Sequence, residues 1–296
     1  MKRSKTEVRF YSRPRLKSPV LVAGWPGIAN IGLTAVNYLR AKLRAKKLAE
    51  INPEPFFFPR KILIEGGLLR DMEFPEGTFY YYKGEPDLIF FLGEAQPHEE
   101  AKIYAMANLI LDVAEKFGVR RVYTAAAAVA SVHHSLEPRI WAVPNSPKLL
   151  PELKRYNVVL LSDLEERRGS GNITGLNGVL IGVARERNME GVCFLGEIPV
   201  YIAHFPLQYP KASRAILNVL TAVLGVRIDM GEIGFYAEQA DREIERLYQS
   251  LPPEVRNELD KLKTAAPQAG PITERDKEKI LKEIEEFFKK GKGEQS

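Results

Sequence analysis

The chain contains little cysteine and little histidine: one cysteine, Cys193, and four histidines among 296 residues. A lone cysteine cannot form an internal disulfide, and without a second thiolate the common structural zinc sites are excluded. A single cysteine also fits a reducing compartment better than a secreted scaffold. A chain of this length buries enough surface to fold without cross-links, and we expect neither a metal site nor a cofactor.

Long hydrophobic runs are also missing. The longest candidates, residues 122–132 and 179–184, fall short of the ~18 residues that a membrane-spanning helix needs. The basic N-terminus has no apolar core of the kind found in a secretory signal. These absences predict a cytoplasmic protein with no membrane segment.

The folded body carries almost no net charge, although the whole chain has a formal charge of +5. Residues 1–17 hold seven Lys or Arg against Glu7, and residues 230–296 hold twelve basic and fifteen acidic residues. A nucleic-acid-binding protein would carry a basic patch interleaved with aromatic residues on its body. None is evident, so nucleic-acid binding is not expected and a solvated basic arm is favoured.

The body reads as strands alternating with helices, which predicts an α/β fold with a mostly parallel sheet and helices on both faces. The expected strands are residues 19–23, 62–65, 78–82, 88–92, 121–130, 158–161, 178–184 and 191–195, and the expected helices are residues 31–47, 97–117, 147–155, 210–224, 235–251, 254–263 and 273–290. The chain divides into a basic arm (1–17), an α/β core (18–230), a helical extension (231–263), a linker (264–272) and a C-terminal amphipathic helix with its tail (273–296).

Two glycine-containing segments are candidate ligand loops. The first follows the first strand and contains Gly24, Gly27, Asn30 and Gly32. Its spacing matches neither a dinucleotide fingerprint nor a P-loop, so a tight strand-to-helix turn is favoured over phosphate binding. The second contains Asn172, Gly175 and Asn177, and is either a contact loop or a surface loop.

Polar residues expected at the ends of strands offer a catalytic alternative. Glu94, His133 and Glu197 could perform acid–base chemistry if they converged at the carboxyl edge of the sheet. The carboxylates could equally cap helices, and the pair His133 and His134 could form a solvated turn. An enzymatic role is therefore left open, with a non-enzymatic one favoured.

Apolar and aromatic clusters are candidate contact surfaces. Ile280, Ile284, Phe287 and Phe288 form one stripe on the last predicted helix, which should dock on its own domain or, alternatively, on another subunit. The aromatic runs 56–58 and 79–82 could face a partner, but filling of the core is favoured for each.

Four segments together resemble the archaeal homologues of the proteasome assembly chaperone 2 family, over residues 15–225. They are Gly24-x-Pro-Gly27-x-x-Asn30-Ile-Gly32, TGLNGVLIG (174–182), GVCFLGEIP (191–199) and YPKASRAIL (209–217). The resemblance implies a fold similar to the nucleoside phosphorylase/hydrolase-like architecture, without an established catalytic site. It also implies self-association or pairing with a related family member, and contact with proteasome α-subunits.

Two further family traits bear on the prediction. Some archaeal members end in a hydrophobic–tyrosine–any-residue tail that inserts into the proteasome α-ring, whereas this sequence ends Gly293-Glu294-Gln295-Ser296, so activation by insertion is not expected. A carboxylate–amine ligase activity has also been assigned to the family by computation, but the P-loop lysine is missing here. We predict a non-enzymatic assembly chaperone, with an enzyme on the phosphorylase-like fold as the alternative.

Overall fold

A mixed nine-stranded sheet runs through the part of the chain that the structure, a computed structural model, describes: residues 7–163, 172–203, 205 and 207–264. The elements are β1 (Val8–Phe10), β2 (Val20–Gly24), η1 (Ile28–Asn30), α1 (Ile31–Lys42), β3 (Lys46–Ile51), β4 (Lys61–Glu65), β5 (Leu68–Glu73), β6 (Gly77–Tyr82), β7 (Leu88–Gly93), α2 (Glu100–Lys116), β8 (Arg121–Ala130), β9 (Ile140–Pro144), η2 (Pro147–Leu149), α3 (Leu150–Leu153), β10 (Val159–Leu160), η3 (Leu161–Asp163), α4 (Gly175–Glu186), β11 (Glu190–Pro199), α5 (Pro210–Leu224), α6 (Gly231–Gln249) and α7 (Pro253–Thr264).

The strand order is β1-β3-β6-β7-β2-β8-β11-β9-β10, and the four central strands β7, β2, β8 and β11 are parallel. The flanking pairs β3–β6, β6–β7 and β11–β9 are antiparallel. Parallel central strands need cover on both faces, which explains why β2 and β7 are nearly continuous apolar runs. The predicted α/β fold is confirmed, with its parallel strands at the centre of the sheet.

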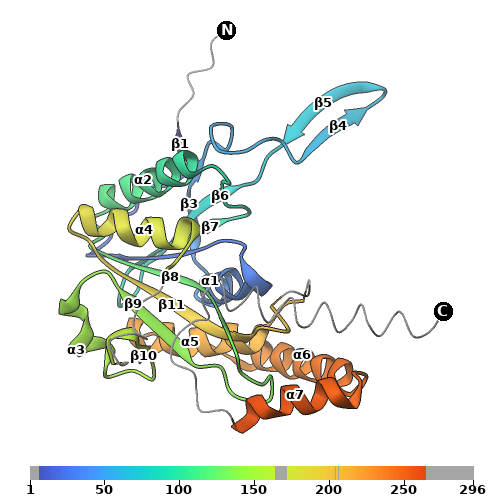
Figure 1. Ribbon diagram of the computed structural model, residues 1–296. Helices are drawn as coiled ribbons and strands as arrows, with labels where there is room; N and C mark the ends of the chain where they lie inside the picture. The colour runs from blue at the N-terminus through green and yellow to red at the C-terminus, as the bar shows by residue number, and fades with distance from the viewer. Residues whose placement is uncertain (1–6, 164–171, 204, 206, 265–296) are drawn as a thin grey trace.

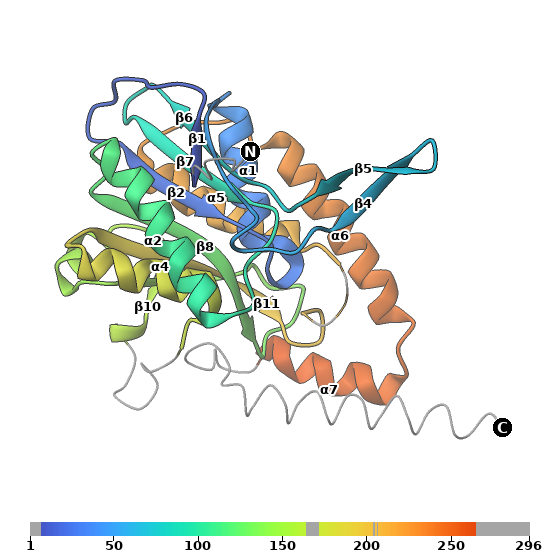
Figure 2. The same cartoon turned by 90° about the horizontal axis from the view of Figure 1, so that it is seen from above.

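Helices cover the two faces of the sheet in separate layers. Helices α2 and α4 pack on one face, where Ile110 and Leu180 are fully buried, and α1 and α5 pack on the other through Leu39 and Ile216. Figures 1 and 2 show the sheet between these two pairs. No helix in the described ranges has the length and apolar character required to cross a membrane.

Helices α6 and α7 lie outside the α1–α5 layer. Ile233 and Ile244 of α6 join the same core as α5, and Lys211 at the start of α5 pairs with Asp241 of α6 at 3.1 Å. Tyr248 of α6 donates a hydrogen bond of 2.6 Å to Asp260 of α7. The last two described helices are thus fixed to the body by apolar packing together with buried polar contacts.

Two sequence predictions are wrong. Residues 178–184, predicted as a strand, lie inside α4, where Leu176, Leu180 and Ala184 recur every four residues and face α2. The helix predicted for residues 31–47 ends at Lys42, and Arg44 turns the chain with a φ of +51° into strand β3. Strand β3 was missed because its sequence, KKLAEI, has no aromatic residue and only one β-branched residue, Ile51, of the types that mark strands.

Helix α1 approaches β8 so closely that only glycine fits at the contact. A Cβ atom on Gly32 would lie 1.9 Å from the carbonyl oxygen of Ala125. This oxygen belongs to the backbone of a central strand and cannot move aside without disturbing the sheet. The close approach supports the prediction that this glycine-containing segment is a tight strand-to-helix turn.

We predict that Gly32→Ala destabilises the protein by about 2–4 kcal/mol, because the added methyl group must displace a strand or a helix. Gly182→Ala is the matched control, since no atom lies within 4 Å of the added Cβ on this exposed turn of α4. The control should be neutral or stabilising by up to about 1 kcal/mol. Urea unfolding of both variants measures the difference, and equal stabilities would contradict the packing argument.

Candidate functional site

The two glycine-containing segments predicted from the sequence meet at the carboxyl ends of the central strands. Residues 24–32 connect β2 to α1. Residues 172–174 precede α4, and Gly175 and Asn177, predicted as loop residues, lie in its first turn. Strands β2 and β8 are neighbours, but the chain continues from β2 toward β3, β6 and β7 on one side and from β8 toward β9 and β11 on the other. Ligands in open α/β sheets bind at such a divergence.

The side chain of Gln96 ties the two segments together. Its Nε2 donates a hydrogen bond of 2.7 Å to the carbonyl oxygen of Pro26, and its Oε1 accepts one of 3.2 Å from the backbone N–H of Leu176. Gly175 has a φ of +68°, and a Cβ there would lie 2.9 Å from Oε1 of Gln96. The glycine thus lets the start of α4 approach the loop that follows β7.

A cavity of about 210 Å³ lies between these segments. Four predicted residues line it: Gly27, Gly32, Asn172 and Asn177. The remaining lining residues are Trp25, Ile28, Gln96, Ile173, Thr174 and Leu195, with residues 125–129 of β8. Sequence reasoning missed Trp25 and the role of the alanine run in β8, which shapes the cavity only because the two loops fold over it.

The other predicted loop residues have backbone roles. A Cβ on Gly24 would come within 2.9 Å of Val36, so this glycine allows α1 to pack on β2. Asn30 and the preceding Ala29 have φ values of +52° and +50°. Two consecutive left-handed residues other than glycine are costly, and tertiary contacts must hold this turn in place.

The three candidate acid–base residues have separate partners. Glu197 is 2% exposed; Arg139 donates to it through Nε at 3.0 Å and Nη2 at 2.6 Å, and Trp141 donates through Nε1 at 2.9 Å. Glu94 accepts a hydrogen bond of 3.0 Å from Arg60 near the base of the β4–β5 hairpin. Within the described residues, no hydrogen bond or ion pair joins Glu94, His133 or Glu197 to one another.

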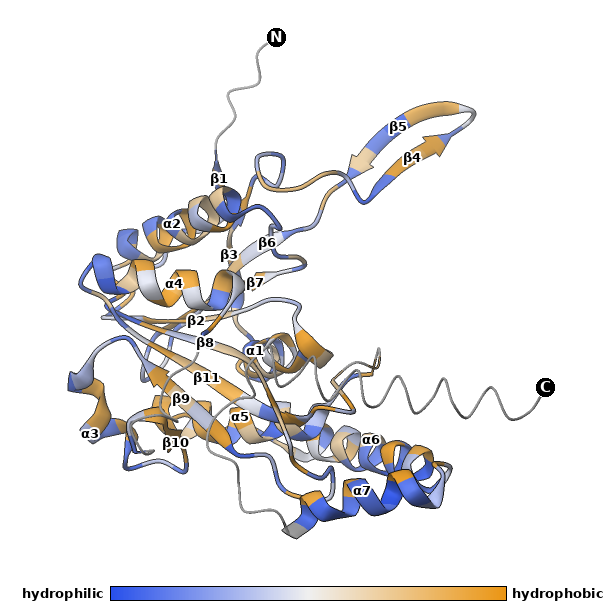
Figure 3. Cartoon of the chain, viewed as in Figure 1, coloured by the Kyte–Doolittle hydropathy of each residue, from blue (hydrophilic) through white to orange (hydrophobic). Residues whose placement is uncertain are grey.

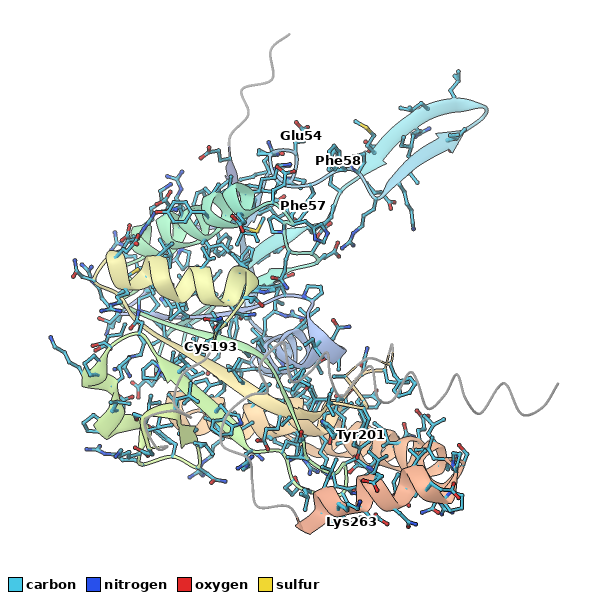
Figure 4. All side chains as sticks on the ribbon, viewed as in Figure 1. Glu54, Phe57, Phe58, Cys193, Tyr201 and Lys263 are labelled. Atoms are coloured by element: carbon cyan, nitrogen blue, oxygen red, sulfur yellow. The ribbon has the colours of Figure 1, made fainter. Side chains whose placement is uncertain are left out.

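His133 and His134 form a buried cluster, which corrects the interpretation of the pair as a solvated turn. Their ring centres are 4.1 Å apart, and each residue is at most 3% exposed. The backbone N–H of His134 donates to the Tyr201 hydroxyl at 2.8 Å, and Nε2 of His134 lies 3.0 Å from Glu245 of α6. Figure 4 shows Tyr201 beside the helical extension, at the end of which Lys263 lies. The histidines therefore join the end of β8 to α6.

Burial lowers the pKa of His133 to about 4, and electrostatic interaction with the neighbouring His134 and Lys263 contributes to the shift. The carboxylates of Asp260 and Glu245 oppose it. The Nε2 atom of His133 lies 3.9 Å from Asp260, too far for a hydrogen bond. The folded protein therefore holds this histidine in its neutral form.

The β4–β5 hairpin projects from the body and has one apolar face. The register pairs Ile62 with Met72 and Ile64 with Leu69, so these four side chains share a face. The opposite face carries charged residues from both strands, together with Leu63 and with Leu68, which pairs with Glu65. All residues of both strands are exposed, and Ile64 is 72% exposed. Figure 3 shows this uncovered apolar colouring at the far end of the molecule.

The aromatic runs divide between the core and the surface. Phe56 and Phe79 are buried, as favoured from the sequence, whereas Phe58 is 83% exposed at the start of the segment that leads to the hairpin. Figure 4 places Phe57 and Phe58 on the body side of β4 and β5. The predicted docking stripe of Ile280, Ile284, Phe287 and Phe288 lies outside the described residues.

Comparison with known proteins gives a consistent family. A model described as the PAC2 family matches residues 21–248. An uncharacterized protein of Methanocaldococcus jannaschii is 25% identical over 262 residues, which are 88% of this chain and 92% of that protein.

The similar solved structures include proteins linked to the proteasome. Pyrococcus furiosus PbaB, an archaeal proteasome activator, has a TM-score of 0.69 at 28% identity, covering 81% of this chain and 97% of PbaB. Pyrococcus furiosus PbaA, an archaeal homologue of proteasome-assembly chaperone, has a TM-score of 0.61 at 21% identity, covering 86% and 99%. A proteasome-assembly chaperone homologue of Mycobacterium tuberculosis has a TM-score of 0.65 at 23% identity, covering 82% and 99%. The last two show the shared fold.

The His133 cluster predicts loss of stability in mild acid. Because the pKa of His133 is lower in the folded protein than its ordinary value of 6.5, the unfolded chain binds this proton more readily. The free energy of unfolding should be highest above about pH 6.5 and should fall as the pH approaches 4. Urea unfolding at several pH values across this range measures it. His133→Gln should flatten this dependence, and His98→Gln, which changes an exposed histidine, should leave it unchanged. An equal slope in all three proteins would contradict the assignment.

Proposed function

The chain belongs to the PAC2 family, and on that basis we propose that it is a non-enzymatic, proteasome-assembly-chaperone-like protein. It acts in the cytoplasm by associating with itself and by contacting proteasome α-subunits. A related family member is an alternative partner to a second copy. The likeness to PbaB, at 28% identity over 97% of that chain, supports the link to the proteasome.

The observation that carries the proposal is the uncovered apolar face of the β4–β5 hairpin. An isolated two-stranded hairpin is marginally stable in water, and large apolar patches on soluble proteins commonly mark contact sites. The face formed by Ile62, Ile64, Leu69 and Met72 has no cover from the described residues. Protein contact explains why these side chains are apolar, whereas catalysis on the body does not.

A second copy of the chain fits this face by charge. Residues 60–73 contain three basic and three acidic residues, and the ion pairs Arg70–Glu65 and Lys61–Glu73 lie within the hairpin. Two such hairpins carry no net charge and can approach each other without net repulsion. A strongly charged partner would gain little electrostatic attraction from this hairpin. Because a standard interface covers about 800 Å² on each partner, the body must contribute further surface.

We predict that the full-length protein is an oligomer and that Ile64→Lys shifts it toward monomer, because a charge placed within an apolar interface must be desolvated. Leu63→Lys is the matched control, since the neighbouring residue faces the opposite side of the same strand. Light scattering after size exclusion, at several protein concentrations, measures the mass. A monomeric parent protein, or equal dissociation of both variants, would contradict the role of this face.

We predict a complex with proteasome α-subunits of the same organism on co-expression, detected by native mass spectrometry as masses containing both chains. Assembled α-rings and free α-subunits are tested separately, which distinguishes binding during assembly from binding to the finished particle. Absence of any complex with either form would refute the proteasome link while leaving self-association untouched.

A further inference from the structure

An apolar groove lies between helices α6 and α7 and the segment that follows β11. Its volume is about 90 Å³, and its described lining is aliphatic or aromatic throughout. The lining includes Leu247 of α6, Val255 and Leu259 of α7, and Phe205 of the segment after β11. Leu247 is 52% exposed and Phe205 is 50% exposed. Two large apolar side chains left half exposed beside one groove indicate a contact surface.

The groove continues along α6 into a second cavity of about 190 Å³. Leu207 and Ile244 line both cavities, and Tyr236 and Ala240 line the second. Tyr236 and Ala240 are four residues apart, and Leu247 follows after seven more, so the three lie on one face of α6. The apolar surface is therefore elongated along a helix, a shape that an amphipathic helix fits.

The sequence that follows α7 contains an apolar stripe of matching size. This stripe lies outside the described residues and consists of Ile280, Ile284, Phe287 and Phe288, which recur at helical spacing. Along a helix the stripe would extend about 12 Å, and the residues from Tyr236 to Leu247 extend about 16 Å along α6. The groove is thus long enough to take the whole stripe.

The described chain ends beside this groove. Helix α7 ends at Thr264, and Nζ of the preceding Lys263 lies 5.7 Å from the ring centre of Tyr248, which lines the groove. The linker, residues 264–272, spans up to about 30 Å when extended, whereas α7 is about 18 Å long. The stripe can therefore reach the groove of its own chain. A linker this short holds it there at a high effective concentration.

We propose that residues 273–290 bind in this groove as an amphipathic helix, with the stripe packed against α6 and α7 of the same chain. The high effective concentration favours this intramolecular contact over the same contact with a second copy. The segment carries six acidic and six basic residues, so its apolar stripe and not its net charge provides the attraction. The proposal is independent of the hairpin and of the proteasome role.

The test measures how fast a thiol in the groove reacts in the full-length protein. Leu247→Cys places the thiol at the groove, and Glu238→Cys places one about two and a half turns away, on the opposite side of α6. The native Cys193 is buried and does not compete. Ile284→Ser together with Phe287→Ser removes the middle of the stripe without changing the net charge.

The thiol at position 247 should react at least fivefold faster when Ile284→Ser and Phe287→Ser are both present, because the stripe no longer covers it. Lys282→Ser together with Glu286→Ser is the matched control, since it changes the polar face of the same segment and also leaves the net charge unchanged. This control should leave the rate unchanged. The protection at position 247 should also persist on dilution, because the contact is intramolecular.

Three results would overturn the proposal. The first is that both serine pairs, or neither, accelerate the reaction at position 247. The second is protection that disappears on dilution, which would assign the groove to a second copy. The third is that Ile284→Ser with Phe287→Ser accelerates the reaction at position 238 as much as at position 247, which would show a general loosening of the helical extension.

Discussion

The close contact of α1 with β8 at Gly32 is the constraint on which most of the structure depends. It brings α1 near enough to the sheet for α5 to pack beside it on the same face, with the Ser213 hydroxyl donating to the carbonyl of Ile31 at 3.0 Å. Helix α6 then packs on α5, and the Tyr38 hydroxyl of α1 donates to the carbonyl of Asp229 just before α6 at 3.0 Å. The position of Gly32 thus affects the positions of three helices that pack on one another: α1, α5 and α6.

The molecule has two surfaces of different character. At the carboxyl ends of the central strands, charged residues are absent from the described lining of the cavity. The nearby buried carboxylate of Glu197 is occupied by Arg139 and Trp141, which suits a structural role better than proton transfer. The projecting hairpin, by contrast, exposes an apolar face that none of the described residues covers.

Sequence patterns predicted the elements whose apolar residues form a continuous run or recur at regular spacing. Strands β2 and β7 follow from continuous apolar runs, and helix α5 follows from helical spacing. Residues 178–184 were misassigned because a short apolar run does not distinguish a strand from a buried helix. The amphipathic hairpin could not be foreseen, because β5 was not recognised and an irregularity between Leu63 and Ile64 sets which side chains share a face. The cavity likewise depends on Gln96, whose two hydrogen bonds join segments 70 and 80 residues away.

Thiol reactivity at the hairpin tests the central claim most directly. The one native cysteine, Cys193, is buried, and burial raises its pKa to about 12, so a thiol introduced on the hairpin reacts alone. In an isolated chain Ile64→Cys should react faster than Leu63→Cys, because Ile64 is 72% and Leu63 38% exposed. If a second copy covers the apolar face, the thiol at position 63 should react faster than the thiol at position 64 in the concentrated protein. Dilution should restore the faster reaction at position 64. Faster reaction at position 64 at every concentration would contradict the account.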